Sequence, residues 1–593
     1  MDKMPEIRPK RGLCGSLTVM MSLVLFIIVS LMLVTLEHAY LNAGKTLAFQ
    51  TLNKALESAL GNYYAPLYTQ YGLFALPLGE GLSYENISAL EESMAAMAEV
   101  TFSGTEDEET DGFFWDMDIY GCVVMDEAYM TDINGALFKE QVKDATAYDL
   151  VLEISGELLS LEGEDISIIK DLLTDVKDSL KDADEGNTDE EDTDNEEPGE
   201  EGTDVKGSDE NNSVDKSEDT TEQANVTSDK NEESVQDVNN NSTENKETEK
   251  TEEKESAEED ESGVIEVYET LKAFFTDGFS GWWFEDAGKL SEREVDVFEL
   301  PSFEYYGDYE GTELFEEPDF SQMVFEDGEY LDELIDSSFV TDFQNALDNM
   351  LDKGSTKVSL AGYSVMNMDN YLTDNVDGEL KYEQEYLIFG GGNDEYNVKK
   401  AGWSIFGIRL IANLIYYLTD EEMGEEISSY VSGITGIAKW VTILVVIVKV
   451  ILAVENAIVE TAAILVGKKV DFAVSKGSLS VGLSELFTFS KSVIASKADN
   501  YTGVSNIKLS YEMYLFIFML MLNEDLLTFR MIDIIEMNMK KLYDSDFFME
   551  DCLVGFSTQM IFDMPSRFTS IGLYGGPGKK DEYQYRVQSV IMY

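Results

Sequence analysis

Hydrophobic residues are concentrated near the N-terminus and again in the last third of the chain. The first run, Leu17 to Leu36, is interrupted only by Ser and Thr, whose hydroxyls bond back to their own helix. About 20 residues at about 1.5 Å each cover the roughly 30 Å hydrocarbon core of a bilayer. The basic residues Arg8, Lys10 and Arg11 should stay inside. The pattern therefore predicts a single-pass membrane helix, with everything after Glu37 outside the cell.

A cleaved secretory signal is the alternative interpretation of this run. Signal cores usually have about 7–15 residues and end in a small-residue cleavage site. The run here is longer and continues into Glu37-His38-Ala39-Tyr40 without such a site. We therefore expect an uncleaved anchor, with a cytoplasmic basic tail at 1–12 and the membrane helix at 13–36.

Apolar residues go on recurring at helical spacing after the membrane run, as far as Gly61-Asn62. Their positions are 41, 48, 52, 55, 56, 59 and 60. The spacing predicts one long helix, half in lipid and half amphipathic outside, which is the layout of pilin-like subunits. An ordinary anchor followed by a stalk helix would produce the same pattern.

Residues 181–263 have the composition of a disordered segment. They contain no Ile, Leu, Met, Phe, Trp or Tyr, and their 33 acidic and 7 basic residues give a net charge of −26. Such a segment buries too little apolar surface to offset its chain entropy. We expect it to be a solvated acidic spacer between 37–180 and 264–593, the two parts of one extracellular body.

The pattern of apolar and polar residues in the body predicts an α+β fold with a helical block towards its C-terminal end. Strands are expected at 113–129, at 381–389 ending at Gly390-Gly391-Gly392, and in the last 50 residues. A turn is expected at Asp132–Gly135. Helices are expected at 138–180, 339–351, 404–418, 434–466 and 511–542, the last as one helix or two.

The helix expected at 434–466 allows two interpretations, because Trp440 to Val454 is almost entirely apolar. It would be long enough for a second membrane span. However, Lys449, Asn456 and Glu460 fall on one helical face, and a charge at mid-bilayer costs about 2.5–3.5 kcal/mol. A buried helix of the extracellular body is the preferred interpretation, and a two-span membrane protein is the alternative.

Charge and composition exclude several classes of function. The net charge of −77 repels nucleic-acid backbones, so no nucleic-acid partner is expected. His38 is the only histidine and lies at the edge of the membrane run, which leaves the body without His-based catalysis or common zinc sites. Cys122 and Cys552 are either a disulfide or two small buried residues.

Candidate chemistry elsewhere is weak. Carboxylate pairs are too abundant to single out the two that a glycosidase needs. Asn375-Val376-Asp377-Gly378 resembles part of a calcium loop, but Thr373 and Gln384 stand where that loop requires acids. Gly390-Gly391-Gly392 lacks the residues of a phosphate-binding loop and is interpreted as a turn. We predict no catalytic residue, no cofactor and no metal site.

Short motifs surround the apolar run: Gly15–Val19 before it, then Glu37, Leu56–Leu60 and Tyr71–Phe74. Together they resemble the N-termini of TadE/TadG-like proteins, which belong to tight-adherence (Flp-type) pilus systems. Prepilin peptidase usually cleaves after Gly with Glu at the fifth position beyond, where this chain has Met20 after Gly15. The resemblance therefore implies a subunit that stays anchored.

Further motifs resemble an uncharacterised family of Gram-positive surface proteins with the same N-terminus, for which no enzyme activity is known. They are Asn134-Gly135, Phe138, Gln141, Glu385–Ile388, Gly390, Tyr416–Leu418, Asp420, Ser510-Tyr511 and Asp551–Gly555. The resemblance covers most of the chain except the acidic spacer and its aromatic flank. It implies a tie to pilus assembly or secretion at the cell surface.

The sequence thus predicts a non-enzymatic, single-pass surface protein of the cell membrane, with its N-terminus inside. Its expected partners are membrane lipid and the membrane proteins of a pilus or secretion system, both contacted through the N-terminal helix. A cell-surface glycan hydrolase that uses carboxylates, or an adhesin, is the first alternative. A two-span membrane protein is the second.

Overall fold

The computed structural model describes twelve ranges of the chain. They are 14–103, 117–149, 282–284, 289–306, 311–315, 337–350, 355–375, 377–435, 438–486, 490–505, 507–568 and 582–593. The predicted basic tail at 1–12, the acidic spacer at 181–263 and the predicted helix beyond residue 149 lie outside the described residues.

Helices dominate the described residues, and strands are few, so the predicted α+β class is confirmed. The helices are α1 (Cys14–Leu60), α2 (Ala65–Tyr71), α3 (Ile87–Ser103), α4 (Asp132–Asp149), α8 (Pro301–Tyr306), α11 (Ser338–Met350), α12 (Thr356–Asn367), α13 (Glu383–Phe389), α14 (Asp394–Thr419), α15 (Glu421–Thr435), α16 (Ala438–Leu465), α17 (Lys491–Asp499), α18 (Tyr511–Met521) and α19 (Glu524–Leu542). The strands are β1 (Leu76–Pro77), β2 (Asp118–Tyr129), β3 (Val470–Asp471), β4 (Lys508–Leu509), β5 (Cys552–Pro565) and β6 (Glu582–Met592).

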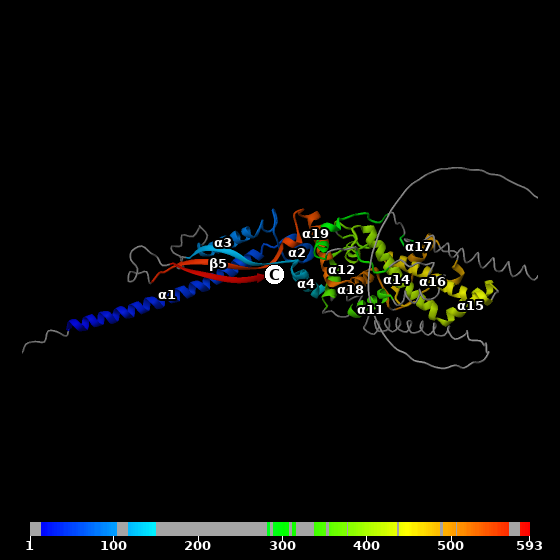
Figure 1. Ribbon diagram of the computed structural model, residues 1–593, viewed down its shortest axis with the longest axis horizontal. Helices are drawn as coiled ribbons and strands as arrows, with labels where there is room; N and C mark the ends of the chain where they lie inside the picture. The colour runs from blue at the N-terminus through cyan, green and yellow to red at the C-terminus, as the bar shows by residue number, and fades with distance from the viewer. Residues whose placement is uncertain are drawn as a thin grey trace, which may run out of the picture. The chain divides into compact units, whose positions relative to one another are not determined.

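Helix α1 is continuous over 47 residues, as the apolar spacing predicts (Figure 1). Its apolar 18-residue window is 0% buried in the structure. From Glu37 onward one face is buried, and that face includes Ala48, Leu52 and Leu56. The change coincides with the end of the hydrophobic run, so the two halves of α1 have different surroundings: one carries exposed apolar side chains, and the other is part of the core.

An antiparallel sheet covers the second half of α1 together with α3. Strand β5 is central, with β2 on one side and β6 on the other, and β1 extends the β6 side. Alternate residues of β5 are buried, among them Met560, Phe562 and Met564, and they pack with Leu52 and Leu56 of α1. This period of two is what a sheet with one covered face requires. The predicted strands at 113–129 and in the last 50 residues are thereby confirmed at 118–129, 552–565 and 582–592.

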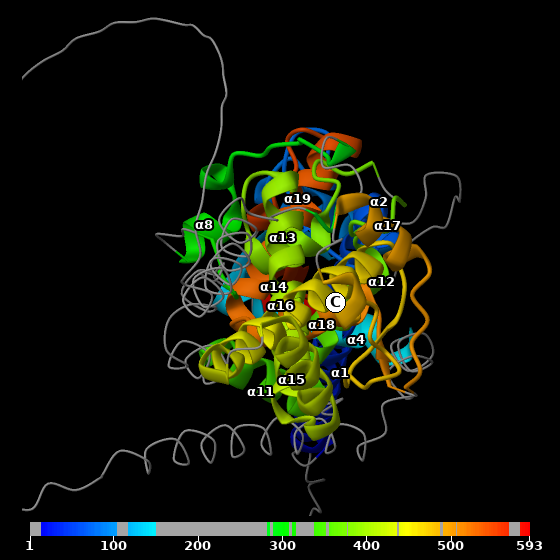
Figure 2. The same cartoon turned by 90° about the vertical axis from the view of Figure 1, so that its right-hand side faces the viewer.

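The helices α11 to α19 pack on one another and are referred to below as the helical block. The predicted helices at 339–351, 404–418 and 434–466 appear as α11, α14 and α16, and the segment 511–542 divides into α18 and α19. Helix α14 packs along α16 (Figure 2). The turn predicted at Asp132–Gly135 is confirmed by left-handed φ angles of 51°, 55° and 66° at Ile133, Asn134 and Gly135.

The strand predicted at 381–389 is wrong: residues 383–389 form the short helix α13. Every residue of α13 is buried, its polar side chains included, so the helix shows no alternation between an exposed and a buried face. Glu383 and Glu385 accept hydrogen bonds from the backbone N–H groups of Asp369 and Tyr371, each at 2.8 Å. Gly390 ends the helix in the left-handed conformation, with φ 64°.

Helix α16 is a core helix of the block. Asn456 and Glu460, two members of the predicted polar face, are buried against α14, and Lys449 is partly buried. Glu460 pairs with Arg409 and also accepts from Asn413 Nδ2 at 2.7 Å. Of the described helices, Leu17–Leu60 and Asp394–Thr419 are long and apolar enough to cross a membrane, and the window of the second is 78% buried. These contacts favour the interpretation of 434–466 as a buried helix.

Candidate functional site

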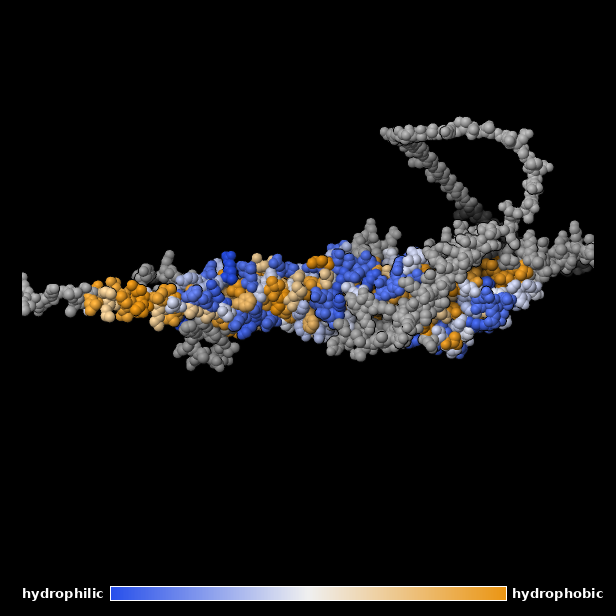
Figure 3. All heavy atoms as spheres, turned by 90° about the horizontal axis from the view of Figure 1, so that it is seen from below, coloured by the Kyte–Doolittle hydropathy of each residue, from blue (hydrophilic) through white to orange (hydrophobic). Residues whose placement is uncertain are grey.

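The first candidate surface is the exposed apolar half of α1, which appears as the continuous hydrophobic segment in Figure 3. Its large side chains from Leu17 to Leu36 are almost all solvent-exposed. Two of its hydroxyls bond back to the helix as expected, Ser22 to the Val19 carbonyl and Thr35 to the Met32 carbonyl, both at 2.8 Å. A contiguous apolar surface of this size marks a membrane or protein interaction site.

Glu37 closes this surface and joins it to the body. It is 3% exposed, and its carboxylate accepts the backbone N–H groups of Arg567 and Phe568 at 3.2 and 2.6 Å. The Phe568 ring also meets Tyr40 edge to face, with centroids 6.0 Å apart. The segment after β5 is therefore held at the end of the apolar run.

Sequence reasoning used Glu37 as the boundary of the apolar run and as part of the TadE/TadG-like motif, and it missed the contact of Glu37 with the segment after β5. The available signal was its position on the helix. Glu37, Tyr40 and Ala48 lie on the face that becomes buried further along α1. An acid at the start of a buried stripe needs a donor in the body.

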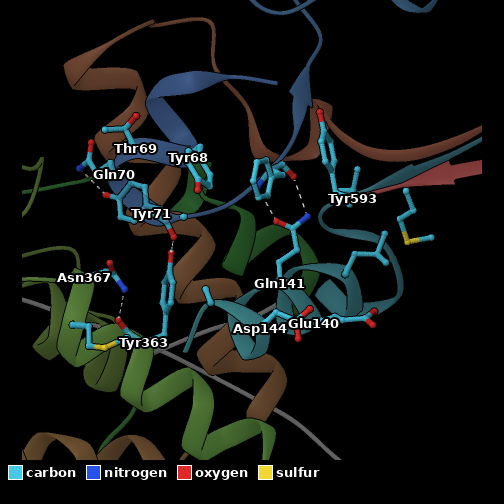
Figure 4. A pocket seen from close by; sticks show the side chains of 17 residues that line it. Tyr68, Thr69, Gln70, Tyr71, Glu140, Gln141, Asp144, Tyr363, Asn367 and Tyr593 are labelled. Carbon is cyan, nitrogen blue, oxygen red and sulfur yellow. Dashed lines mark hydrogen bonds between the residues drawn. The ribbon is translucent and has the colours of Figure 1, made fainter. Parts of the chain in front are cut away.

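The second candidate is a cleft of about 1010 Å³ that lies beside α2, α4 and α12 and the ends of β5 and β6 (Figure 4). Two motifs that the sequence analysis noted separately meet in its wall. The Gln141 side chain of α4 donates to the Phe74 carbonyl at 2.9 Å and accepts the Phe74 N–H at 2.8 Å. Because both backbone groups of Phe74 are held, the loop after α2 has a defined position.

Aromatic rings form one side of the cleft. Tyr68 packs on Phe74 with centroids 4.5 Å apart, and Phe74 stacks on Tyr593 at 5.4 Å and 17°. The Tyr593 hydroxyl donates to the Leu60 carbonyl at the end of α1. Tyr68 is 43% exposed, so its ring is accessible at the edge of this stack.

Polar groups form the opposite side. Tyr363 of α12 donates its hydroxyl to the Tyr71 carbonyl at 2.6 Å, and Asn367 donates to the Tyr363 carbonyl at 3.0 Å. Glu140 and Asp144 lie one turn apart on α4, and both are exposed. In Figure 4, Tyr68 and Tyr593 lie opposite Tyr363 and Asn367.

A separate set of carboxylates lies in the core near α13 and α19. Burial raises the pKa of Glu383, of Glu385 and of Asp533 to about 7 each. Their partners are buried groups: Asn538 donates to Glu383 at 2.6 Å, and Tyr386 donates to Asp533 at 2.8 Å. None of the three carboxylates lines the cleft, so their raised pKa values reflect their burial in the helical block.

The described residues of the calcium-loop-like segment at 375–378 and the glycines at 390–392 make structural contacts. The Asp377 carboxylate pairs with Arg293 at 2.9 Å, and the hydrogen bond from Arg293 lowers the pKa of Asp377. Gly391 donates its N–H to Asn397 Oδ1 at 2.8 Å, as part of a turn. Over the described ranges, no group of three His, Cys, Asp or Glu side chains has the arrangement of a metal site.

The possible disulfide is not formed. Cys122 and Cys552 are both free and buried. In the antiparallel register, Cys122 lies opposite Met560, whereas Cys552 lies opposite Pro77, eight residues away along β5. At about 3.4 Å per residue this separation is far beyond the reach of a disulfide. The second interpretation, two small buried residues, is the correct one.

Comparison with known proteins relates the body to one family. Residues 252–564 match the model of DUF5702, a family of unknown function, over more than half of the chain. The matched range contains the helical block and most of β5, and it begins after α1. No curated protein and no solved structure matches the chain. From the extent of the family match, the chain belongs to the DUF5702 family.

Proposed function

We propose that this chain is a non-enzymatic, membrane-anchored surface protein that takes part in a tight-adherence (Flp-type) pilus or secretion system. The apolar half of α1 crosses the membrane once, with the N-terminus inside and the body outside. The observation that carries the proposal is the difference between the two halves of α1. In one uninterrupted helix, the first half exposes its apolar side chains, and the second half packs against the body.

The physical support is the number of apolar side chains that α1 leaves uncovered. Large residues such as Leu25, Ile27 and Leu31 are each more than half exposed. Burial of each is worth roughly 1.5–3 kcal/mol, so a lipid environment stabilises this half strongly. The second half needs no lipid, because the sheet and α3 already cover its apolar face.

One long helix, half in lipid and half amphipathic outside, is the layout of pilin-like subunits. On α1 the side of the second half that points away from the sheet is available to neighbouring helices. Phe49, 47% exposed, is a large apolar residue at the edge of this half, one turn from Lys45 and Asn53, which contact β6. The proposed partners are membrane proteins of the pilus or secretion system, which would pack against this side and against the apolar half in lipid.

Site-specific photo-crosslinking in living cells tests the proposal. A photoreactive residue is placed at Leu25 or at Phe49, with Tyr543, 50% exposed and distant in sequence from α1, as the matched control position. Captured complexes are identified by mass spectrometry through an epitope inserted in 181–263. We expect pilus or secretion-system membrane proteins from the two α1 positions and not from Tyr543.

The two parts of the proposal fail separately. Carbonate-resistant membrane association, with crosslinks to lipid only, would discard the pilus assignment and leave the anchor. Release of the full-length protein into the medium would discard the anchor itself.

A further inference from the structure

We propose that the cleft beside α2, α4 and α12 binds a neutral glycan, with the exposed Tyr68 ring as its stacking surface. The cleft of about 1010 Å³ is at the upper end of the size range of small-molecule sites. This inference concerns the body alone and does not depend on the proposed role of α1 in a pilus.

The aromatic side of the cleft is held in place before any ligand arrives. Tyr68, Phe74 and Tyr593 form one stack, tied to α4 by Gln141 and to the end of α1 by the Leu60 carbonyl. A fixed aromatic surface offers apolar contact at little entropic cost. The C–H faces of pyranose rings are the flat apolar surfaces of otherwise polar molecules, and they match such a stack.

The polar side supplies acceptors for hydroxyl groups. Glu140 and Asp144 project from successive turns of α4, and within the described part of the chain neither has an ion-pair partner. Gln70 and Asn367 add carboxamides at the rim. Carboxylates and carboxamides opposite an aromatic face can accept and donate to the hydroxyls of a sugar ring while its C–H face stacks.

Charge determines which glycans fit. No Lys or Arg occurs among the residues that line the cleft, and the chain carries a net charge of −77. An anionic polymer would meet the carboxylates of Glu140 and Asp144 without a counter-charge. The ligand class that satisfies both sides of the cleft is an uncharged oligosaccharide.

The test is binding of the purified full-length protein, in detergent, to an array of neutral oligosaccharides that includes cellohexaose and chitohexaose. Affinities of the captured glycans are then measured by titration calorimetry. Tyr68→Ala should weaken binding by roughly tenfold, since it removes the stacking ring. Tyr68→Phe should retain binding because the ring remains.

Two further variants separate the cleft from the rest of the surface. Asp144→Asn keeps the shape of α4 but removes a charged acceptor, and we expect a loss of about threefold to tenfold. Tyr120→Ala removes a tyrosine that is 70% exposed on β2, away from the cleft, and should change nothing. Circular dichroism verifies the folding of each variant.

Three results would overturn the inference. The first is that no neutral oligosaccharide binds at millimolar concentration. The second is a bound glycan whose affinity is the same for wild type and for Tyr68→Ala. The third is that a lysine-rich peptide binds in a Tyr68- and Asp144-dependent manner while the glycans do not, which would assign the cleft to basic peptides instead.

Discussion

Glu385 lies in the core of the helical block with only one of its two carboxylate oxygens engaged. Oε1 accepts from the Tyr371 N–H and from the Tyr511 hydroxyl, whereas Oε2 has no hydrogen-bond partner among the described residues. Burial raises its pKa from an ordinary 4.5 to about 7, and the donors on Oε1 oppose that rise. The folded protein therefore binds a proton at this site more tightly than the unfolded chain does.

The sign of the resulting pH dependence follows from linkage. A raised folded-state pKa gives stability that is fully present below about pH 4.5 and is lost as the pH rises through about 7. Glu385→Gln keeps an oxygen acceptor and removes the titration. Between pH 4.5 and 8 the wild type should lose about 3 kcal/mol more unfolding free energy than the variant, on the order of the shift itself.

Urea denaturation at several pH values, followed by circular dichroism, measures this difference. Glu425→Gln, at an exposed position of α15, is the matched control and should titrate like the wild type. Equal slopes for Glu385→Gln and the wild type would show that Glu385 is ionised in the core at all these pH values.

Among the elements, α1 joins its apolar half to the sheet, and Glu37 is the first of its side chains to contact the segment after β5. The Glu37 carboxylate accepts hydrogen bonds from two backbone N–H groups, those of Arg567 and Phe568, just after the end of β5. Because α1 continues without interruption, the position of this contact sets how the sheet lies along the helix. The end of β5 consequently lies level with the start of the half of α1 that packs against the sheet.

Glu37→Ala should destabilise this end of the sheet, because two backbone N–H groups lose the buried carboxylate that accepts from them. The cost is about 1–3 kcal/mol, and it should be local. Amide hydrogen exchange at Arg567 and Phe568 should become faster, with little change in the helical block. Glu57→Ala, an exposed acid on the same helix, should leave the exchange as it is. Unchanged protection in Glu37→Ala would mean that the two N–H groups have other acceptors.

At the scale of the whole molecule, the apolar half of α1 lies outside the core. The hydrophobic core shared by α1, α3 and the sheet begins at Tyr40, and none of its buried residues belongs to Leu17–Leu36. The stability of the sheet should therefore not depend on the apolar half of α1, whereas we expect the solubility of the protein to depend on it.

A chain that begins at residue 37 tests this separation. We expect it to remain in the soluble fraction and to melt within a few degrees of the full-length protein in detergent, as seen by circular dichroism. A chain that also lacks 37–60 is the control. It removes the apolar face under β5, so it should unfold or aggregate. Loss of cooperative melting on removal of 1–36 alone would show that the apolar half packs on the body.

Much of this architecture follows from local pattern. The length of α1, the turn at Asp132–Gly135, the strands β2 and β5 and the helices α11, α14, α18 and α19 are all visible in the spacing of apolar and polar residues. Some of these elements, such as α11, have one buried and one exposed face, and others, such as α18, are almost entirely apolar. Their own sequence therefore carries the periodicity that identifies them.

Tertiary contacts decided the rest. Helix α13 is buried on all sides, so its sequence shows no exposed face, and the carboxylates of Glu383 and Glu385 accept hydrogen bonds from the backbone of Asp369 and Tyr371. The cleft joins Tyr68, Gln141, Asn367 and Tyr593, which no local pattern connects. Whether Cys122 meets Cys552 depended on strand register, which places them eight residues apart along β5. Periodicity reports the environment of a single segment, whereas sites and pairings arise from distances between segments, and only the packed chain sets those distances.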